Sequence, residues 1–126
     1  MNTNAIVLDT RTIDEFSGKR RKKGATKAGT IPNSIHIDWA ETINHNGKKR
    51  IKSIQDLENI YSKLHIKKDD PIIVYYHSGA RSTHTTFVIT QLLGYKNVKN
   101  YDCSWTKWSC FNDLPFESNS IKVIKN

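Results

Sequence analysis

The strongest constraint on the fold is the stretch Ile72–Tyr76, five apolar or aromatic residues with no polar residue between them. A strand that is apolar on both faces needs cover on both sides, and a parallel sheet between helices provides it. The breaker sequence Asp69-Asp70-Pro71 precedes this stretch, and the turn sequence Ser78-Gly79 follows it. We therefore predict a short, buried central strand that runs directly into a tight turn.

Further strand-like runs alternate with helix-like stretches along the rest of the chain. The runs expected to be strands are Ala5–Leu8, Ile35–Ile37 and Asn97–Tyr101. Strand and helix alternation with short connections predicts an α/β sandwich of three layers, with a mostly parallel central sheet and helices on both faces. With 126 residues, the chain is long enough for one hydrophobic core, so we interpret residues 1–126 as a single domain.

Three helices are expected between these strands. The first covers Thr12–Phe16, because its first residue and Glu15 have the spacing of a capping box. The second begins at Ser53 and keeps apolar residues at helical spacing as far as Leu64. The third is predicted to end at Gly94 in the left-handed conformation. Its predicted apolar face consists of Phe87, Val88, Leu92 and Leu93.

Basic residues outnumber acidic ones by twenty to twelve, which gives a formal net charge of +8. Much of the excess lies in Lys19–Lys23 and Lys48–Lys52, and the first run falls within a glycine-rich segment, 17–30, that we expect to be an exposed loop. A solvated lysine-rich surface accounts for such runs, and the alternative is an anionic partner, either a small oxyanion or an acidic protein. Neither run is interleaved with aromatic residues, which argues against a nucleic-acid partner.

The same composition argues against several other classes of protein. No apolar run approaches the roughly 20 residues that a membrane span needs, and Met1–Arg11 lacks the features of a signal peptide. The two cysteines, Cys103 and Cys110, have neither metal-site spacing nor the number for a disulfide framework. We expect a cytoplasmic protein with reduced thiols, without a metal and without a cofactor.

The turn after the central strand is the expected binding site. Ligands of open parallel sheets bind at the carboxyl ends of strands, and here the strand leads through His77, Ser78, Gly79, Ala80 and Arg81 into a helix. Backbone N–H groups converge in such a turn, and the start of the helix adds partial positive charge. An arginine there adds a fork-shaped cation. The residues predict an anion cradle, and a plain strand-to-helix turn remains the alternative.

Four segments carry a resemblance to a known family. They are Val7–Arg11 with Asp14–Phe16, then Gly29–Ile37 (GTIPNSIHI), Tyr76–Phe87 (YHSGARSTHTTF) and Asn97–Trp108 (NVKNYDCSWTKW). In order and spacing they resemble the rhodanese domain, most closely the carboxy-terminal catalytic half of two-domain thiosulfate and 3-mercaptopyruvate sulfurtransferases. The resemblance covers about residues 4–117 and implies a rhodanese-like fold. It also implies self-association or pairing with a second rhodanese domain.

The resemblance also exposes a departure at the turn. In the family, a cysteine begins a six-residue CxxGxR loop whose amides surround a persulfide sulfur. Gly79 and Arg81 match that pattern, but Tyr76 stands at the cysteine position. Tyrosine has an ordinary pKa of about 10, attacks sulfur poorly and cannot hold a persulfide. The family activity moves sulfur from thiosulfate or 3-mercaptopyruvate to a thiophilic acceptor.

We interpret that activity as lost or reduced here. The domain would then act as a module that binds a small sulfur-containing oxyanion or an acidic protein. The alternative is an active sulfurtransferase that uses Cys103, at the glycine position of the last motif, or a cysteine from a partner chain.

Other residues receive smaller roles. Asp102 and Trp105 are expected to form the wall of the pocket. We expect His77 to face solvent, His84 to be structural, and Asp9 to brace loops by hydrogen bonding. The aromatic residues proposed for a self-association face are Trp39, Trp108, Phe111 and Phe116, although core packing is favoured for Trp108.

Overall fold

The computed structural model describes residues 5–44, 50–77, 80–101, 104–110, 114 and 116, with only the backbone placed for 80 and 81. Its main sheet has four parallel strands in the order β2-β1-β5-β6. The strands are β1 (Ile6–Asp9), β2 (Ile35–His36), β5 (Ile72–Tyr75) and β6 (Val98–Asn100). The predicted parallel sheet is therefore confirmed, with the apolar stretch β5 at its centre beside β1.

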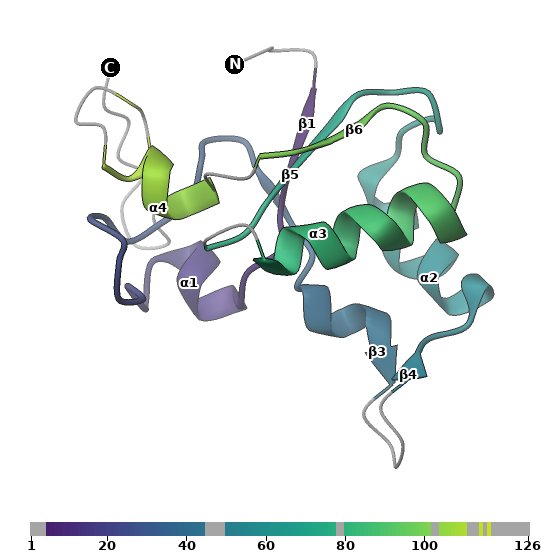
Figure 1. The fold of residues 1–126 in the computed structure, drawn as a ribbon, viewed down its shortest axis with the longest axis horizontal. Coiled ribbons are helices and arrows are strands. Elements are labelled where there is room, and N and C mark those ends of the chain that lie inside the picture. The colour runs from purple at the N-terminus through teal and green to yellow at the C-terminus, as the bar shows by residue number, and fades with distance from the viewer. Residues whose placement is uncertain are drawn as a thin grey trace.

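A small antiparallel pair lies apart from this sheet. It joins β3 (Ile43–Asn44) to β4 (Arg50–Ile51), and it projects at the lower edge of the molecule in Figure 1. The turn predicted at Asn46-Gly47 falls outside the described residues.

The helices separate the strands, as the periodicity predicted. They are α1 (Ile13–Ser17), the 3-10 turn η1 (Trp39–Thr42), α2 (Ile54–Tyr61) with η2 (Ser62–Leu64), α3 (Ala80–Phe87) with the π-helical turn η3 (Val88–Leu92), and α4 (Ser104–Trp108). Among the described residues, none of these helices combines the length and the apolar character needed to cross a bilayer.

Local capping explains where the first helices begin. Thr12 caps α1, because its hydroxyl accepts the Glu15 N–H at 3.3 Å and donates to the Glu15 carboxylate at 3.0 Å. Ser53 caps α2 in the same way by accepting the Asp56 N–H at 3.2 Å. A full capping box occurs instead at Asp38 and Glu41, at the start of η1, which the sequence reading missed.

The third predicted helix is present, but its predicted inner face is wrong at Phe87. That ring is 50% exposed, whereas Ser82 and Thr85 are fully buried on the inner side of α3. The π-helical turn then changes the register, since the Leu93 N–H donates to the Val88 carbonyl five residues back at 3.2 Å. The apolar face therefore begins at Val88, and small polar residues line the helix before it.

The two faces of the main sheet are covered unequally. On one face, Leu8, Ile72 and Val74 pack in a large cluster with residues of α2 and η3. The other face carries a smaller cluster, whose buried members are Val7, Ala25, Ile31, Tyr75 and Trp105. Segment 25–31 and α4 supply most of the cover there.

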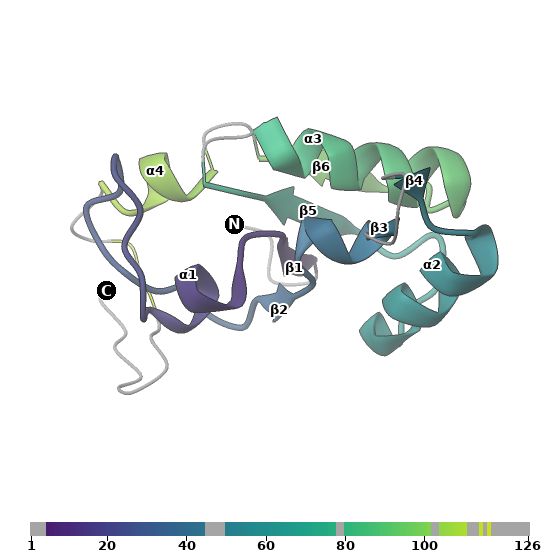
Figure 2. The same cartoon turned by 90° about the horizontal axis from the view of Figure 1, so that it is seen from below.

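The basic segment 17–30 is only partly the exposed loop that was predicted. Ala25 and Thr30 are 6% and 4% exposed, because this end of the segment packs against the strand ends. The segment, α1 and α4 gather at one end of the molecule, to which the carboxyl end of β5 points (Figures 1 and 2). The fold thus brings a basic segment to the edge of the sheet where a binding site is expected.

Candidate functional site

The carboxyl end of β5 is held against the start of α4. The Tyr76 N–H donates to the Ser104 hydroxyl at 2.9 Å. In return, the Tyr76 carbonyl accepts the Trp105 N–H at 2.9 Å, and the His77 carbonyl accepts the Thr106 N–H at 3.0 Å. First-turn N–H groups of a helix need partners from outside the helix. Here the strand end supplies two of them, which fixes the chain just before the turn at 78.

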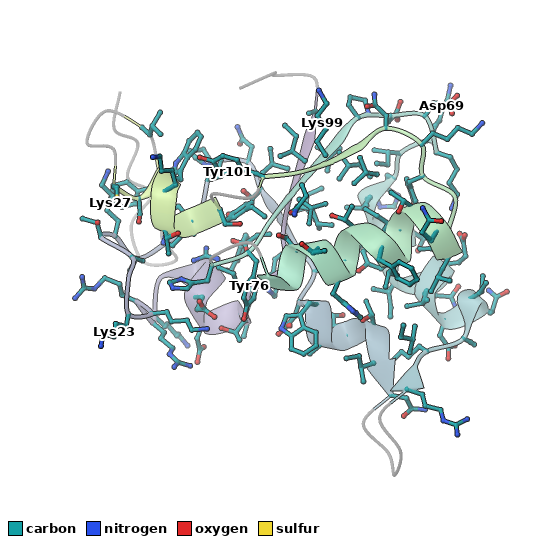
Figure 3. The ribbon with its side chains drawn as sticks, in the orientation of Figure 1. Lys23, Lys27, Asp69, Tyr76, Lys99 and Tyr101 are labelled. Carbon is teal, nitrogen blue, oxygen red and sulfur yellow. The ribbon has the colours of Figure 1, made fainter. Side chains whose placement is uncertain are left out.

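Tyr76 points into the protein beside the basic segment. Its side chain is 8% exposed, and the Lys22 ammonium lies 5.6 Å from the ring centroid, within the range of a cation–π contact. Figure 3 shows Tyr76 near the start of α3, with Lys23 and Lys27 at the same end of the molecule. Positive charge therefore gathers where β5 ends.

His77 is buried, contrary to the expectation that it faces solvent. It is 6% exposed, and its Nε2 lies 2.9 Å from the Lys23 carbonyl. Gly24 lies beside the ring, since a Cβ at that position would be in ordinary van der Waals contact with Nε2 at 3.6 Å. Burial lowers the pKa of His77. Lys22 and Arg11 lower this pKa further, whereas the hydrogen bond to Lys23 and the charge of Glu15 oppose the shift.

The end of β1 carries a buried ion pair that the sequence reading did not find. Arg11 Nη2 lies 2.7 Å from Asp9 Oδ2, and both side chains are almost fully buried. The same carboxylate oxygen accepts the Tyr75 hydroxyl at 2.6 Å and the Thr30 hydroxyl at 2.8 Å. Asp9 therefore braces loops by hydrogen bonding, as expected. The available signal was a pair of opposite charges two residues apart at the end of a buried strand.

Aromatic rings and a carbonyl enclose the Arg11 guanidinium. Its Cζ lies 4.8 Å from the Trp105 ring centroid and 5.6 Å from that of Tyr75, and Nη2 also donates to the Gly29 carbonyl. Burial by itself would lower the pKa of Arg11, but the adjacent Asp9 carboxylate raises it above its ordinary value. The guanidinium therefore stays charged, and its partners hold it inside the protein.

The remaining predicted pocket residues fall into three groups. Ser78, Gly79, Asp102 and Cys103 lie outside the described residues, and only the backbone of Ala80 and Arg81 is placed, in the first turn of α3. Trp105, expected in a pocket wall, is 1% exposed and donates its indole N–H to the Lys27 carbonyl at 2.9 Å. Cys110, for which no site role was predicted, is exposed just after α4, and its thiol donates to the Thr106 carbonyl.

His84 and the expected aromatic face are involved in internal packing. His84 Nε2 lies 2.7 Å from the Thr42 hydroxyl, and its ring meets that of Trp39 edge-on at 5.8 Å, in keeping with a structural role. Trp108 and Phe116 pack against the smaller core cluster. Phe111 lies outside the described residues. Self-association through these rings stays a prediction.

Comparison with known proteins identifies the family to which the chain belongs. The family model described as "Rhodanese-like domain" matches residues 1–110. Among curated relatives, "Putative thiosulfate sulfurtransferase SseA" of Mycobacterium tuberculosis is 42% identical over 108 residues, which is 81% of this chain and 35% of that protein. "Sulfur carrier protein TtuD" of Thermus thermophilus is 39% identical over 115 residues, covering 86% of this chain and 40% of that protein.

Solved structures agree on the fold. The wild-type structure of EanB superimposes with a TM-score of 0.77 at 22% identity, over 93% of this chain and 28% of that one. The 3-mercaptopyruvate sulfurtransferase from Leishmania major gives a TM-score of 0.71 at 19% identity, over 86% of this chain and 30% of that one. This chain spans less than half the length of each protein that it matches here.

Proposed function

The chain belongs to the rhodanese-like domain family, and within that family we propose that it is a binding module that has lost standard persulfide transfer. Its ligand would be a small sulfur-containing oxyanion or the acidic group of a partner protein. The binding site would be the turn that follows β5. Because the chain spans only 35% to 43% of its curated relatives, the proposal includes pairing with a second rhodanese domain.

The observation that carries the proposal is the tyrosine at position 76. Standard transfer needs a thiolate that attacks the outer sulfur of thiosulfate, so that a cysteine persulfide forms and sulfite leaves. Cyanide then takes that sulfur as thiocyanate and restores the thiolate. A phenol oxygen cannot form the sulfur–sulfur bond on which both steps depend.

The charges around the turn support an anionic ligand. Lys22 lies over the Tyr76 ring, and it belongs to the run Lys19–Lys23, in which every residue is basic. The eight-residue helix α3 begins at Ala80 and directs the partial positive charge of its amino end toward the turn. Sulfonate, sulfate and carboxylate groups all suit such surroundings.

A second candidate function is favoured by the relatives. Thiosulfate sulfurtransferases and a sulfur carrier protein are among the proteins that this chain resembles at 39% to 42% identity. An active sulfurtransferase would then need a thiol from Cys103 or from a partner chain.

One assay separates the two candidates. Thiocyanate formation from thiosulfate and cyanide is measured for the wild-type protein and for Tyr76→Cys, Tyr76→Ser and Cys103→Ser. We expect turnover in Tyr76→Cys alone, because that change restores the nucleophile, whereas Tyr76→Ser only removes the ring. Wild-type turnover that disappears in Cys103→Ser would instead establish the second candidate. Titration of the wild-type protein with thiosulfate, followed by calorimetry, tests whether the anion binds without reacting.

A further inference from the structure

The backbone of the basic segment is anchored to the domain through its carbonyl groups. His77 Nε2 lies 2.9 Å from the Lys23 carbonyl oxygen, and the Trp105 indole N–H donates to the Lys27 carbonyl at 2.9 Å. Both of these side chains are buried, so the bonds are formed on the inner side of the segment. Residues 19–29 form no helix or strand, yet their main chain is held in place.

Four basic side chains of this anchored segment are exposed. We call them the basic surface, and they are Lys19, Arg20, Arg21 and Lys23. Lys22 is not part of it, because its ammonium lies over the ring of the buried Tyr76. The labelled Lys23 in Figure 3 marks this end of the molecule. A fixed main chain therefore presents four cations to solvent within five consecutive residues.

Within the described part of the chain, no carboxylate neutralises the basic surface. At the other end of the molecule, Lys68 pairs with Glu58 at 2.9 Å, and Lys96 Nζ lies 3.9 Å from Asp69 Oδ1. None of the four cations of the basic surface has such a partner among the described residues. Clustered like charges repel one another and oppose compact folding. An anionic partner would remove this repulsion, and the anchored main chain would hold the cations ready for it.

An exposed isoleucine lies beside the basic surface. Ile13 is the first residue of α1 and is 59% exposed. The basic segment folds back to this helix, since the Arg20 N–H donates to the Asp14 carbonyl at 3.0 Å. The exposed Asp14 carboxylate makes no ion pair with the basic surface among the described residues. Protein interfaces combine apolar anchors with a charged edge, so an exposed isoleucine next to cations favours a protein partner over a nucleic acid.

We propose that the basic surface and Ile13 form a docking surface for an acidic segment of a partner protein, in which carboxylates flank an apolar side chain. The Arg20 guanidinium can bind a carboxylate through two parallel hydrogen bonds. Cations spread over residues 19–23 suit a row of carboxylates better than one small anion, which needs donors that converge on a point. None of these residues belongs to the turn after β5, so the docking surface goes beyond the proposed function.

The charged part of the surface is tested with a short fluorescein-labelled peptide of glutamates around one central leucine. Its binding is followed by fluorescence anisotropy at low salt. Reversing two cations in Lys19→Glu/Arg20→Glu should weaken binding about tenfold, because each change replaces an attraction with a repulsion. The matched control is Lys63→Glu/Lys67→Glu, which changes the net charge equally at two exposed lysines around η2. It should weaken binding much less.

The apolar part is tested by a second pair of variants. Ile13 and Ile54 are each the first residue of a capped helix, and they are 59% and 55% exposed. Ile13→Ser should weaken binding of the leucine-containing peptide about fivefold, as expected if about half of the side chain becomes buried. Binding of an all-glutamate peptide should not change. Ile54→Ser should affect neither peptide.

Several outcomes would overturn the docking surface. Absence of peptide binding at low salt would do so, as would equal losses in the two charge-reversed pairs, since attraction would then depend on net charge alone. Equal effects of Ile13→Ser and Ile54→Ser would remove the apolar contact that favours a protein. Tighter binding of polyuridylate of the same length would assign the surface to nucleic acid. Thiosulfate titration of the wild-type protein tests the turn separately, so a failed docking surface is distinguishable from a failed anion site.

Discussion

The ends of β1 and β5 are adjacent at one edge of the sheet, yet their polar groups are arranged in opposite ways. After β1, the Asp9 carboxylate is surrounded by Arg11, Thr30 and Tyr75, and all four side chains are buried. After β5, the buried His77 ring keeps an acceptor without a partner among the described residues. The first arrangement pairs its buried polar groups with one another, whereas the second leaves a buried acceptor unpaired among the described residues. The comparison separates buried polar groups that the fold satisfies internally from one that it does not.

The largest expected change in stability comes from the end of β1, where the buried polar groups around Asp9 are paired. Asp9→Asn leaves Arg11 buried without its counter-charge, and removing one partner of a buried pair typically costs about 3–5 kcal/mol. We expect a loss of that size in the free energy of unfolding, measured by urea denaturation. Glu58→Gln is the matched control. It breaks the exposed pair between Lys68 and Glu58, which is 2.9 Å long, and should cost less than about 1 kcal/mol. Equal losses in the two variants would contradict the role assigned to Asp9.

A smaller loss is expected from Tyr75→Phe. The ring stays in the core, but the hydroxyl that donates to Asp9 and contacts Thr30 is removed. Leaving part of a buried hydrogen-bond network unpaired costs about 1–3 kcal/mol. Urea denaturation should show this decrease, with anion binding at the β5 end unchanged. A variant as stable as the wild-type protein would show that the hydroxyl adds no stability to the hydrogen-bond network around Asp9.

The smallest effect should come from the end of β5, where His77 should make the free energy of unfolding depend on pH. The pKa of His77 is lowered in the folded protein, so folding favours the neutral ring. The unfolded chain binds more protons at pH values between the two pKa values, and stability therefore rises with pH in that window. The contribution is present above the ordinary histidine pKa of about 6.5 and is lost as the pH falls toward the lower, folded value.

The comparison of wild-type protein with His77→Gln isolates this contribution. The difference between their unfolding free energies should shrink from about pH 8 to about pH 5. A difference that stays constant with pH would contradict the lowered pKa and would make the two strand ends more alike than proposed.

Much of the fold could be predicted because its signals are local. The absence of alternation in Ile72–Tyr76 predicted a covered parallel sheet, and β5 lies at its centre. Thr12, Ser53 and Gly94 marked helix ends through bonds or backbone angles that involve only near neighbours. Phe87 was assigned to the wrong face because a π-helical turn is not visible in an apolar pattern.

The site was harder to predict, since its contacts join distant parts of the chain. Tyr75 and Asp9 are 66 residues apart in sequence, and His77 and Lys23 are 54 apart. Nothing near position 77 indicates that the distant Lys23 carbonyl would lie within hydrogen-bond distance of its ring. For this reason a histidine in a polar turn was expected to face solvent, although it is buried.

The amino-acid sequence alone determined the kind of sheet, most helix starts, the family resemblance and the presence of a tyrosine, which has no thiol, at position 76. These properties depend on residue identity and on neighbours a few positions away. Only the tertiary structure decided which buried polar groups have hydrogen-bond partners and which do not. That choice depends on which segments meet at the sheet edge, because burial makes an unpaired polar atom costly only after the chain has closed around it.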